Sequence, residues 1–350
     1  VKSRTTSRNI RRMKIGLILH VDADDIPDVT RRYQEQLSLV EYAEAVGIDC
    51  VWLTEHHGQP DSPTPRPELF IAHALARTQR IAFGTAALLL GQRDALDIAE
   101  IIAMLWVLAP QRIKIGLAKG GPFLAHQNIW QANEIRGERL ISSLPALHDW
   151  LEGKGVVLHD KRQPVYLTPY PQGLATVPLY LATRDPLAIA QAARWRMGLM
   201  AAQFWQQARV AESVQTYQRM AGHAPNLMLV RGIYVHEQID IARARAFEQV
   251  QRVRARKAEA KQDNKTTDAP GPDSSKRGID RITLDNIDEF VLVGPESLIS
   301  ERMAALAAIG VSDLALNPMT DHTDERRAQL EAIGRIARSF NAATGHVPAP

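Results

Sequence analysis

The 350-residue chain is 45% hydrophobic and 23% charged, a composition that predicts one large core and excludes a disordered protein. The formal net charge is +3, but the first twelve residues hold five basic side chains. The rest has 37 basic against 39 acidic residues, which argues against nucleic acid as the main partner. No apolar run is long enough to span a membrane, and the single cysteine excludes a disulfide within the chain, so a cytoplasmic protein is expected.

Short apolar runs alternate with amphipathic segments along the chain. Residues 1–12 are interpreted as a disordered basic leader, or as an over-extended start before Met13. The apolar runs predict strands over residues 14–20, 50–54, 81–89, 112–118, 178–183, 198–202, 226–236, 290–294 and 313–317. Helical spacing predicts helices over residues 37–46, 68–78, 96–108, 135–152, 186–194, 206–222, 240–261, 295–308 and 324–344.

Strands that are apolar almost throughout, joined by helices, indicate a parallel sheet covered on its outer face. About eight such units predict a (β/α)8 TIM barrel that forms a single domain over residues 13–344. The stretches AEAVGIDCVWL and LAAIGVSDLAL share the order helix, glycine, aspartate and strand, which supports internal repetition. An open doubly wound sheet is the alternative that this pattern leaves open.

One segment breaks the alternation. Residues 261–285 are polar and rich in proline, glycine, serine and aspartate, so they predict a mobile insertion. The insertion is either a lid over the site or disordered filler. Residues 345–350 are expected to be a frayed tail.

The second strand ends in Glu55, His56 and His57. Functional groups of a parallel barrel lie at the C-terminal ends of its strands. Because successive side chains point in opposite directions, the two histidines are not expected to share a metal ion, and no metal site is predicted. A histidine at a barrel mouth suits proton transfer, and Glu55 is expected to orient it. The structural alternative is a histidine satisfied by loop carbonyls.

Two further strand ends carry cations. Lys119 and Gly120 follow the fourth strand, where backbone N–H groups beside a lysine favour an anion. Thr183 and Arg184 follow the fifth strand, and Arg184 is expected either to bind phosphate or to pair with Asp185.

The third strand ends in small residues, from Gly84 to Ala87. Small side chains let a flat group approach the backbone, unless neighbouring side chains fill the space.

These segments together resemble the bacterial luciferase-like flavin monooxygenases. The resemblance is carried by VWLTEHH, RIAFGTAALLL, AEIIAMLWVLAPQRIKIGLAKGG, VPLYLATRDPLAIAQAA and VGPESLISERMAALAAIGVSDLAL. These stretches appear in the family's order and cover most of the chain from Met13 to about Phe340. The resemblance implies a TIM barrel with an insertion near the seventh strand, assembled as a homo- or heterodimer.

The resemblance also implies the chemistry. It implies FMN, reduced by a separate flavin reductase, with O2 as co-substrate and a small organic molecule oxygenated through a C4a-peroxyflavin. His56 matches the catalytic histidine of the family, beside a glutamate that matches Glu55. Ala86 and Ala87 match an alanine pair joined by a cis peptide under the flavin ring.

Other positions imply contacts to the cofactor. Lys119, with Gly120, falls at a phosphate-binding position, and Arg139 matches another arginine of the phosphate site. Thr183 and Arg184 fall in the flavin-binding turn.

The chain departs from the family pattern around the third helix. Asp94 and Asp97 stand where the family often has other residues, and Trp106 replaces an aspartate. These departures are expected around the cofactor face and a supporting helix. They keep two rival functions open: hydride transfer with a deazaflavin, and a non-catalytic flavin-binding or partner subunit.

Overall fold

The computed structural model describes residues 12–22, 26–59, 62–121, 133–158, 162–263 and 278–343. Apart from Arg12, the expected leader lies outside these residues, as does the expected tail.

The described residues form nine strands and nine α-helices. The strands are β1 (Lys14–Leu19), β2 (Cys50–Leu53), β3 (Ala82–Leu88), β4 (Ile113–Ala118), β5 (Leu179–Ala182), β6 (Gly198–Ala201), β7 (Leu227–Val235), β8 (Val291–Gly294) and β9 (Val311–Pro318). The helices are α1 (Val29–Val46), α2 (Pro67–Leu75), α3 (Ala95–Leu108), α5 (Asn133–Leu151), α6 (Pro186–Arg194), α7 (Gln207–Ala221), α8 (Ile239–Asp263), α9 (Glu296–Ala308) and α10 (Thr323–Ala343).

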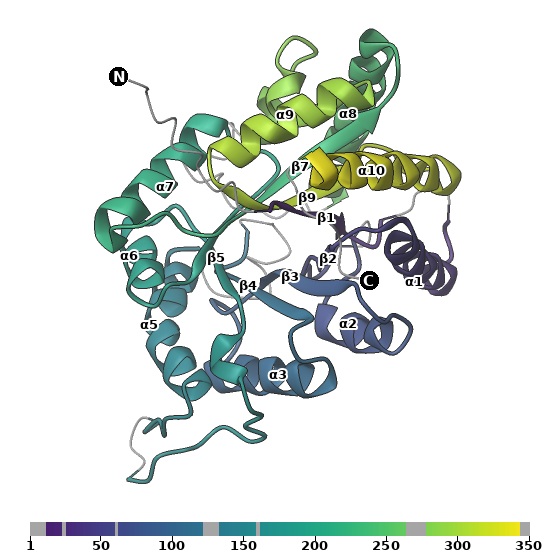
Figure 1. The fold of residues 1–350 in the computed structure, drawn as a ribbon. Helices are drawn as coiled ribbons and strands as arrows, with labels where there is room; N and C mark the ends of the chain where they lie inside the picture. Colours follow the sequence, from purple (N-terminus) through teal and green to yellow (C-terminus); the bar gives the residue numbers. More distant parts are fainter. Residues whose placement is uncertain are drawn as a thin grey trace.

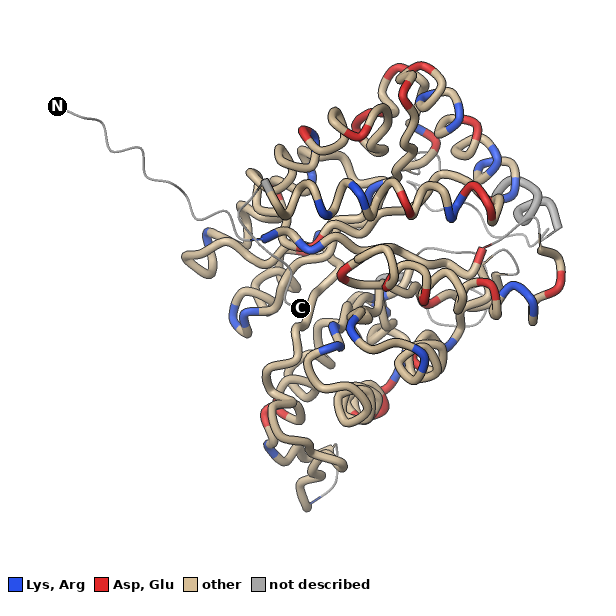
Figure 2. Tube along the Cα trace, turned by 45° about the vertical axis from the view of Figure 1, so that its right-hand side comes forward, with Lys and Arg blue, Asp and Glu red and all other residues tan. Residues whose placement is uncertain are grey.

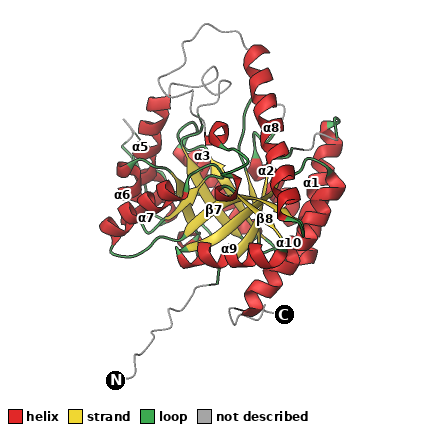
Figure 3. Ribbon diagram, turned by 90° about the horizontal axis from the view of Figure 1, so that it is seen from above, coloured by secondary structure: helices red, strands yellow, loops and turns green. Residues whose placement is uncertain are grey.

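Eight of these strands close a parallel barrel, which confirms the predicted (β/α)8 fold. Strands β1 to β6 follow one another around the sheet, β7 pairs with β6 and β9, and β9 pairs with β1. The helices surround the strands (Figures 1 and 3). This closure excludes the open doubly wound sheet.

The ninth strand, β8, lies outside the closed ring. The first residues of β7, from Leu227 to Leu229, pair with β6, whereas its last residues, from Gly232, pair with β8. Strand β7 is long enough to pair with β6 along its first residues and with β8 along its last residues. The segment before α9 therefore extends the sheet and is not part of the barrel wall.

The ring of Trp52 fills the inside of the barrel. A Cβ atom at Gly84 would lie 2.1 Å from Cε3 of Trp52, and one at Gly16 would lie 3.1 Å from its Cδ1. Tyr180 meets the indole ring edge-on, with 5.5 Å between the ring centroids. The small residue at position 84 thus admits a neighbouring side chain, which was the alternative to a ligand there.

A buried charge pair lies in the same interior. Lys114 on β4 binds Asp313 on β9, and the Tyr180 hydroxyl donates to Asp313 Oδ2 over 2.9 Å. Cys50 lies beside this group, and burial raises the pKa of its thiol to about 12. Such a thiol is inert near neutral pH, as expected for a cysteine in a buried strand.

The end of the predicted mobile insertion is packed in the structure. Ile279 and Ile282 are buried, and Arg254 of α8 donates to the backbone carbonyls of both. Helix α8 itself continues to Asp263. Residues 264–277 lie outside the described residues, so the choice between lid and filler stays a prediction.

The outer surface mixes charges. Basic and acidic residues are interspersed along the outer helices, with no large area of one sign in this view (Figure 2). This distribution agrees with the near-neutral body that the sequence predicts. Among the helices in the described ranges, none is both long and apolar enough to cross a membrane.

The contact between Gly84 and Trp52 can be tested by Gly84→Ala. The new methyl group would overlap the indole ring, so we expect a loss of about 1–3 kcal/mol in the free energy of unfolding, measured in urea. The companion change Trp52→Phe removes the ring atoms that the methyl group would meet. The double variant should be more stable than the sum of the two single changes predicts; simple additivity would contradict this contact.

Candidate active site

The closed barrel gathers the predicted site residues at the ends of neighbouring strands. Ala118 at the end of β4 pairs in register with Ala182 at the end of β5. Lys119 and Thr183 are the next residues of these two strands, so they lie side by side. The resemblance assigned Lys119 and Thr183 to the cofactor site one at a time. The register of β4 and β5 shows in addition that the two residues are adjacent.

Three alanines form a floor across the mouth. Ala118 and Ala182 end β4 and β5, Ala86 lies two residues before the end of β3, and each of the three is partly exposed. The peptide bond between Ala86 and Ala87 is cis, as the family resemblance implies. Only methyl groups project from this floor, which leaves room for a planar group to lie on it.

The carboxylate of Glu55 is buried beside the floor. Its side chain is 0% exposed, and it accepts a hydrogen bond from the Leu89 backbone N–H over 3.1 Å. Arg93 Nη1 lies 3.5 Å from Oε2 of Glu55, and the same guanidinium binds Glu68 and Asp97. Burial opposes the charge of Arg93, but Glu55 and Glu68 hold the pKa of its guanidinium above the usual value. This network fixes the loop after β3 against the end of β2.

The expected pairing of Glu55 with His56 is corrected by the structure. Glu55 Oε1 lies 2.9 Å from Nε2 of His57, the second histidine. His56 Nδ1 instead lies 2.6 Å from the Ser62 hydroxyl. Residues 55–57 lie beyond the end of β2, and the path of the chain there brings Glu55 to His57 and His56 to Ser62.

His20 is a residue of this site that the sequence analysis missed. It follows β1, and its ring stacks on that of His56 with 5.9 Å between centroids and 9° between planes. The Ser62 hydroxyl donates to the His20 carbonyl over 2.8 Å. His20 stands at a strand end, so the rule that found His56 could have found it too. In the described part of the chain, no group of three His, Cys, Asp or Glu side chains could hold a metal ion.

A second missed residue lies on the cationic side of the mouth. Arg136, in the first turns of α5, is 1% exposed, and its Nη1 donates to the Gly121 carbonyl over 3.0 Å. A Cβ atom at Gly120 would lie 3.3 Å from this nitrogen. Arg139, the expected arginine, is partly exposed one turn later. Glycine is required at position 120 mainly because its φ is 88° and because a Cβ there would lie 2.1 Å from Nε2 of Gln92.

The turn after β5 begins α6. The Asp185 carboxylate caps the first turn of the helix, and the Asp185 backbone N–H donates to the Thr183 hydroxyl over 3.0 Å. The Arg184 guanidinium is exposed and lies 5.3 Å from the ring centroid of Trp205. The structure therefore gives Asp185 a capping role, which weakens its expected pairing with Arg184. Arg231 donates to the Trp205 carbonyl, and burial lowers the pKa of Arg231 to about 10.

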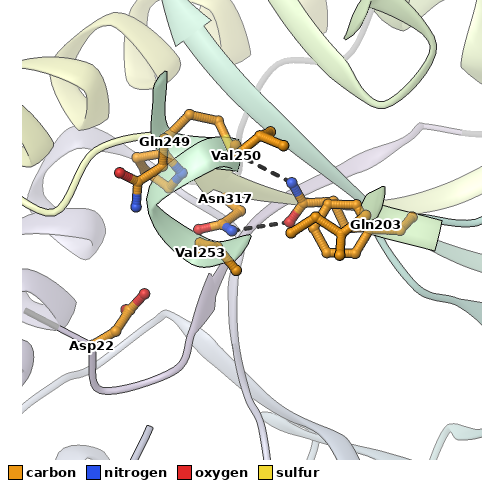
Figure 4. Close-up of a pocket in the computed structure, with 10 residues that line it drawn as sticks. Asp22, Gln203, Gln249, Val250, Val253 and Asn317 are labelled. Carbon is orange, nitrogen blue, oxygen red and sulfur yellow. Dashed lines mark hydrogen bonds between the residues drawn. The ribbon is translucent and has the colours of Figure 1, made fainter. Parts of the chain in front are cut away.

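A cavity of about 40 Å³ lies on the remaining side of the mouth (Figure 4). Gln203 and Asn317, which follow or end β6 and β9, point toward one another in it, and Asn317 Nδ2 donates to Gln203 Oε1 over 3.0 Å. The rest of its lining includes Asp22, Phe204, Gln249, Val250, Val253, Ile279, Pro318 and Met319. Its volume suits one or two waters or a small chemical group.

The departures from the family pattern have structural roles. Asp94 caps the first turn of α3, and Asp97 binds Arg93. Trp106 lies near the other end of α3, where its Nε1–H donates to the Gln172 carbonyl over 3.1 Å. Since α3 leads from the end of β3 back to the start of β4, Trp106 is far from the mouth. The departure at that position lies on a supporting helix, which is one of the two places where the departures were expected.

The comparisons with known proteins agree with the geometry. A family model described as luciferase-like monooxygenase matches residues 13–313. The chain therefore belongs to the luciferase-like monooxygenase family, which confirms the resemblance.

Three similar proteins are informative. The chain is 26% identical over 183 residues to the oxygenase component of a flavin-dependent trigonelline monooxygenase from Acinetobacter baylyi, and the match covers 50% of each chain. Matches to curated relatives of this kind span half or less of the relatives' own length.

Two solved structures share the fold. One is the oxygenating constituent of 3,6-diketocamphane monooxygenase from Pseudomonas putida, a type II Baeyer–Villiger monooxygenase in complex with FMN. Its TM-score is 0.69 at 18% identity, with 92% of this chain and 97% of that chain covered. The other is an F420-dependent secondary alcohol dehydrogenase in complex with an F420–acetone adduct. Its TM-score is 0.70 at 15% identity, with 93% and 98% covered.

The Arg93 network can be tested by Arg93→Met. The change leaves Glu55 and Glu68 buried without this guanidinium, so we expect a loss of about 3 kcal/mol in the free energy of unfolding. Arg66→Met is the matched control, because Arg66 contacts the same Glu68 at 3.7 Å but from a half-exposed position. The control should change stability by less than about 1 kcal/mol. Equal losses in urea unfolding would show that burial of the network is not what matters.

Proposed function

We propose that this protein is a monooxygenase that uses reduced FMN and O2 to oxygenate a small organic substrate. The observation that carries the proposal is the arrangement of the barrel mouth. Cationic side chains border the alanine floor at the ends of β4 and β5, and histidines border it at the ends of β1 and β2. Membership of the luciferase-like monooxygenase family supports it. The name of the trigonelline monooxygenase supports a flavin, and the FMN complex of the diketocamphane monooxygenase supports FMN in particular.

The residues of the mouth fit FMN. The partly exposed methyl groups of Ala86, Ala118 and Ala182 suit the face of a planar isoalloxazine ring. Lys119 and Arg136, with the backbone at Gly120, suit a phosphate, since a guanidinium and an ammonium both favour a dianion. Thr183 and Arg184 border the same side, and Arg139 is the remaining candidate.

The chain's own residues then divide the work. Bound reduced FMN supplies the electrons that activate O2. We assign His56 the role of holding and moving a proton next to the ring. Glu55 has an indirect role. Its contacts with His57, Leu89 and Arg93 position the loops after β2 and β3. These loops then exclude water from this side of the mouth.

A separate flavin reductase is part of the proposal. The A. baylyi relative is named an oxygenase component, which supports supply of the reduced flavin by a second protein. A dimeric assembly and a cytoplasmic location remain predictions from the resemblance and the composition.

A deazaflavin enzyme is the second candidate, because the F420-dependent dehydrogenase has the same fold. Binding of reduced FMN and of reduced F420 to the purified protein, compared by titration, separates the two. Tighter binding of F420, with no reaction toward O2, would favour hydride transfer. Binding of either flavin without any reaction would favour the non-catalytic subunit.

The role of His56 can be tested by rapid mixing of the protein and reduced FMN with oxygenated buffer. For the wild type, we expect a transient species whose absorbance differs from that of both reduced and oxidised FMN. This species should last longer than the one formed by free FMN. His56→Ala should shorten this transient by about 10-fold or more, while FMN affinity stays nearly constant.

His73→Ala is the control, because His73 is exposed on α2. It should behave as the wild type does. An unchanged transient in His56→Ala would contradict the assignment of His56. A wild type that oxidises FMN at the rate of the free flavin would contradict the monooxygenase proposal.

The phosphate site can be tested by comparing FMN with riboflavin, which lacks the phosphate. The ratio of the two affinities isolates the phosphate contacts. Arg136→Gln should lower the preference for FMN by about 10-fold or more, because it removes a buried charged donor. Arg139→Gln, on the same helix but partly exposed, should lower it less. The reverse order would restore Arg139 as the main phosphate ligand.

A further inference from the structure

We propose that Ser62 fixes the tautomer of His56, so that the neutral ring carries its proton on Nδ1 and its lone pair on Nε2. Ser62 would then be a positioning residue for the proton transfer assigned to His56. The inference rests on the proposed function for its catalytic meaning, but its central statement concerns the protein alone.

The hydrogen-bond count around Ser62 carries the argument. Its hydroxyl has one proton, and the His20 carbonyl, 2.8 Å away, can only accept. With the proton donated there, the Ser62 oxygen must accept from its other neighbour. That neighbour is His56 Nδ1 at 2.6 Å, so Nδ1 is the protonated nitrogen.

The opposite arrangement is costly. If the Ser62 proton turned toward His56, the hydrogen bond from Ser62 to the His20 carbonyl would be lost. The loss of one hydrogen bond disfavours that arrangement by roughly 5-fold, so the His56 ring is held mainly in one tautomer.

The backbone keeps the two residues in this relation. The His56 N–H donates to the Thr64 carbonyl over 3.0 Å, and the Ser62 N–H donates to the Gln59 carbonyl over 3.1 Å. Ser62 is 6% exposed and Thr64 is 2% exposed. The hydroxyl is thus held beside the imidazole by the fold, and solvent does not readily replace it.

The neighbouring histidine has the opposite arrangement. His57 Nε2 faces the Glu55 carboxylate at 2.9 Å, so its proton lies on Nε2. Two adjacent histidines are thereby held in different tautomers by different partners. Of the two, His56 is the one whose Nε2 carries the lone pair, and Nε2 is the atom that we assign to proton transfer.

His20 has a similar contact at longer range. Its Nδ1 lies 3.3 Å from the Thr54 hydroxyl, and that hydroxyl donates to the Leu19 carbonyl over 3.3 Å. The Leu19 carbonyl also accepts the Thr54 backbone N–H, so the hydroxyl of Thr54 does not fix the tautomer of His20 as Ser62 fixes that of His56. The two stacked rings nevertheless each have a hydroxyl beside Nδ1.

The tautomer can be measured by NMR on the full-length protein labelled with ¹⁵N in histidine, at a pH where the rings are neutral. His56→Gln identifies the signals of His56. We expect a protonated, pyrrole-type Nδ1 and an unprotonated, pyridine-type Nε2. A protonated Nε2 in the wild type would overturn the proposal without any variant of Ser62.

Two variants test the cause. Ser62→Ala removes the acceptor, so the His56 signals should shift toward a mixture of tautomers, whereas Ser62→Thr keeps the hydroxyl and should preserve the wild-type pattern. An unchanged tautomer in Ser62→Ala would overturn the proposal. These outcomes do not depend on the flavin, so they are distinguishable from a failure of the proposed function.

The catalytic consequence has its own readout. In the rapid-mixing experiment, Ser62→Ala should shorten the absorbance transient of bound FMN by about 3- to 10-fold, with FMN affinity unchanged and with rescue by Ser62→Thr. A loss of FMN affinity without a change in the transient would indicate a structural role only and would overturn the positioning role.

Discussion

The buried carboxylate of Glu55 is the constraint on which the mouth of this barrel depends. A carboxylate with no solvent exposure is tolerated only when its charge and its oxygens have partners. Arg93, His57 and the Leu89 N–H provide them, and all three lie on the loops that follow β2 and β3. Because Arg93 also binds Glu68 and Asp97, one cluster of charges fixes the start of α2 and α3 relative to the alanine floor.

This constraint divides the mouth into sides with different chemistry. The Glu55 cluster and the stacked histidines occupy the ends of β1 and β2. Lys119 and Arg136 lie beyond the alanine floor, on the side of β4 and α5. A small cavity lined by amides, apolar side chains and the carboxylate of Asp22 lies on the side of β6 and β9. A planar cofactor, its phosphate and a small substrate group thus each have a place of suitable character around one barrel end, where parallel barrels keep their functional groups.

The interior of the barrel contains a charged pair as well as aromatic side chains. Trp52 needs the two glycines at positions 16 and 84, and the pair of Lys114 and Asp313 lies next to it. A buried ion pair of this kind adds little net stability compared with an apolar core, but removing one partner leaves a costly charge. Trp52 and this ion pair therefore pack together in the barrel interior beneath the alanine floor.

The sequence by itself determined the barrel and most of the residues at its mouth. Apolar strands alternating with helices require a covered parallel sheet, and the strand-end rule places Glu55, His56 and Lys119 at one edge. The predicted end of α1 at residue 46 is also correct, because Gly47 follows it with a positive φ of 91°, but the helix begins at Val29, eight residues before the predicted start. The family resemblance added the Ala86–Ala87 pair, whose cis peptide the structure contains.

Only the tertiary structure decided which groups meet. It showed that Glu55 contacts His57 and that Ser62 and His20 lie against His56. It also showed that the buried arginine of α5 is Arg136 and not Arg139. It also showed that β8 extends the sheet outside the ring, and that Gly84 makes room for Trp52. The physical reason is that periodicity reports which side of an element is buried, whereas partners separated along the chain are set by register, loop path and packing. No local pattern encodes these three.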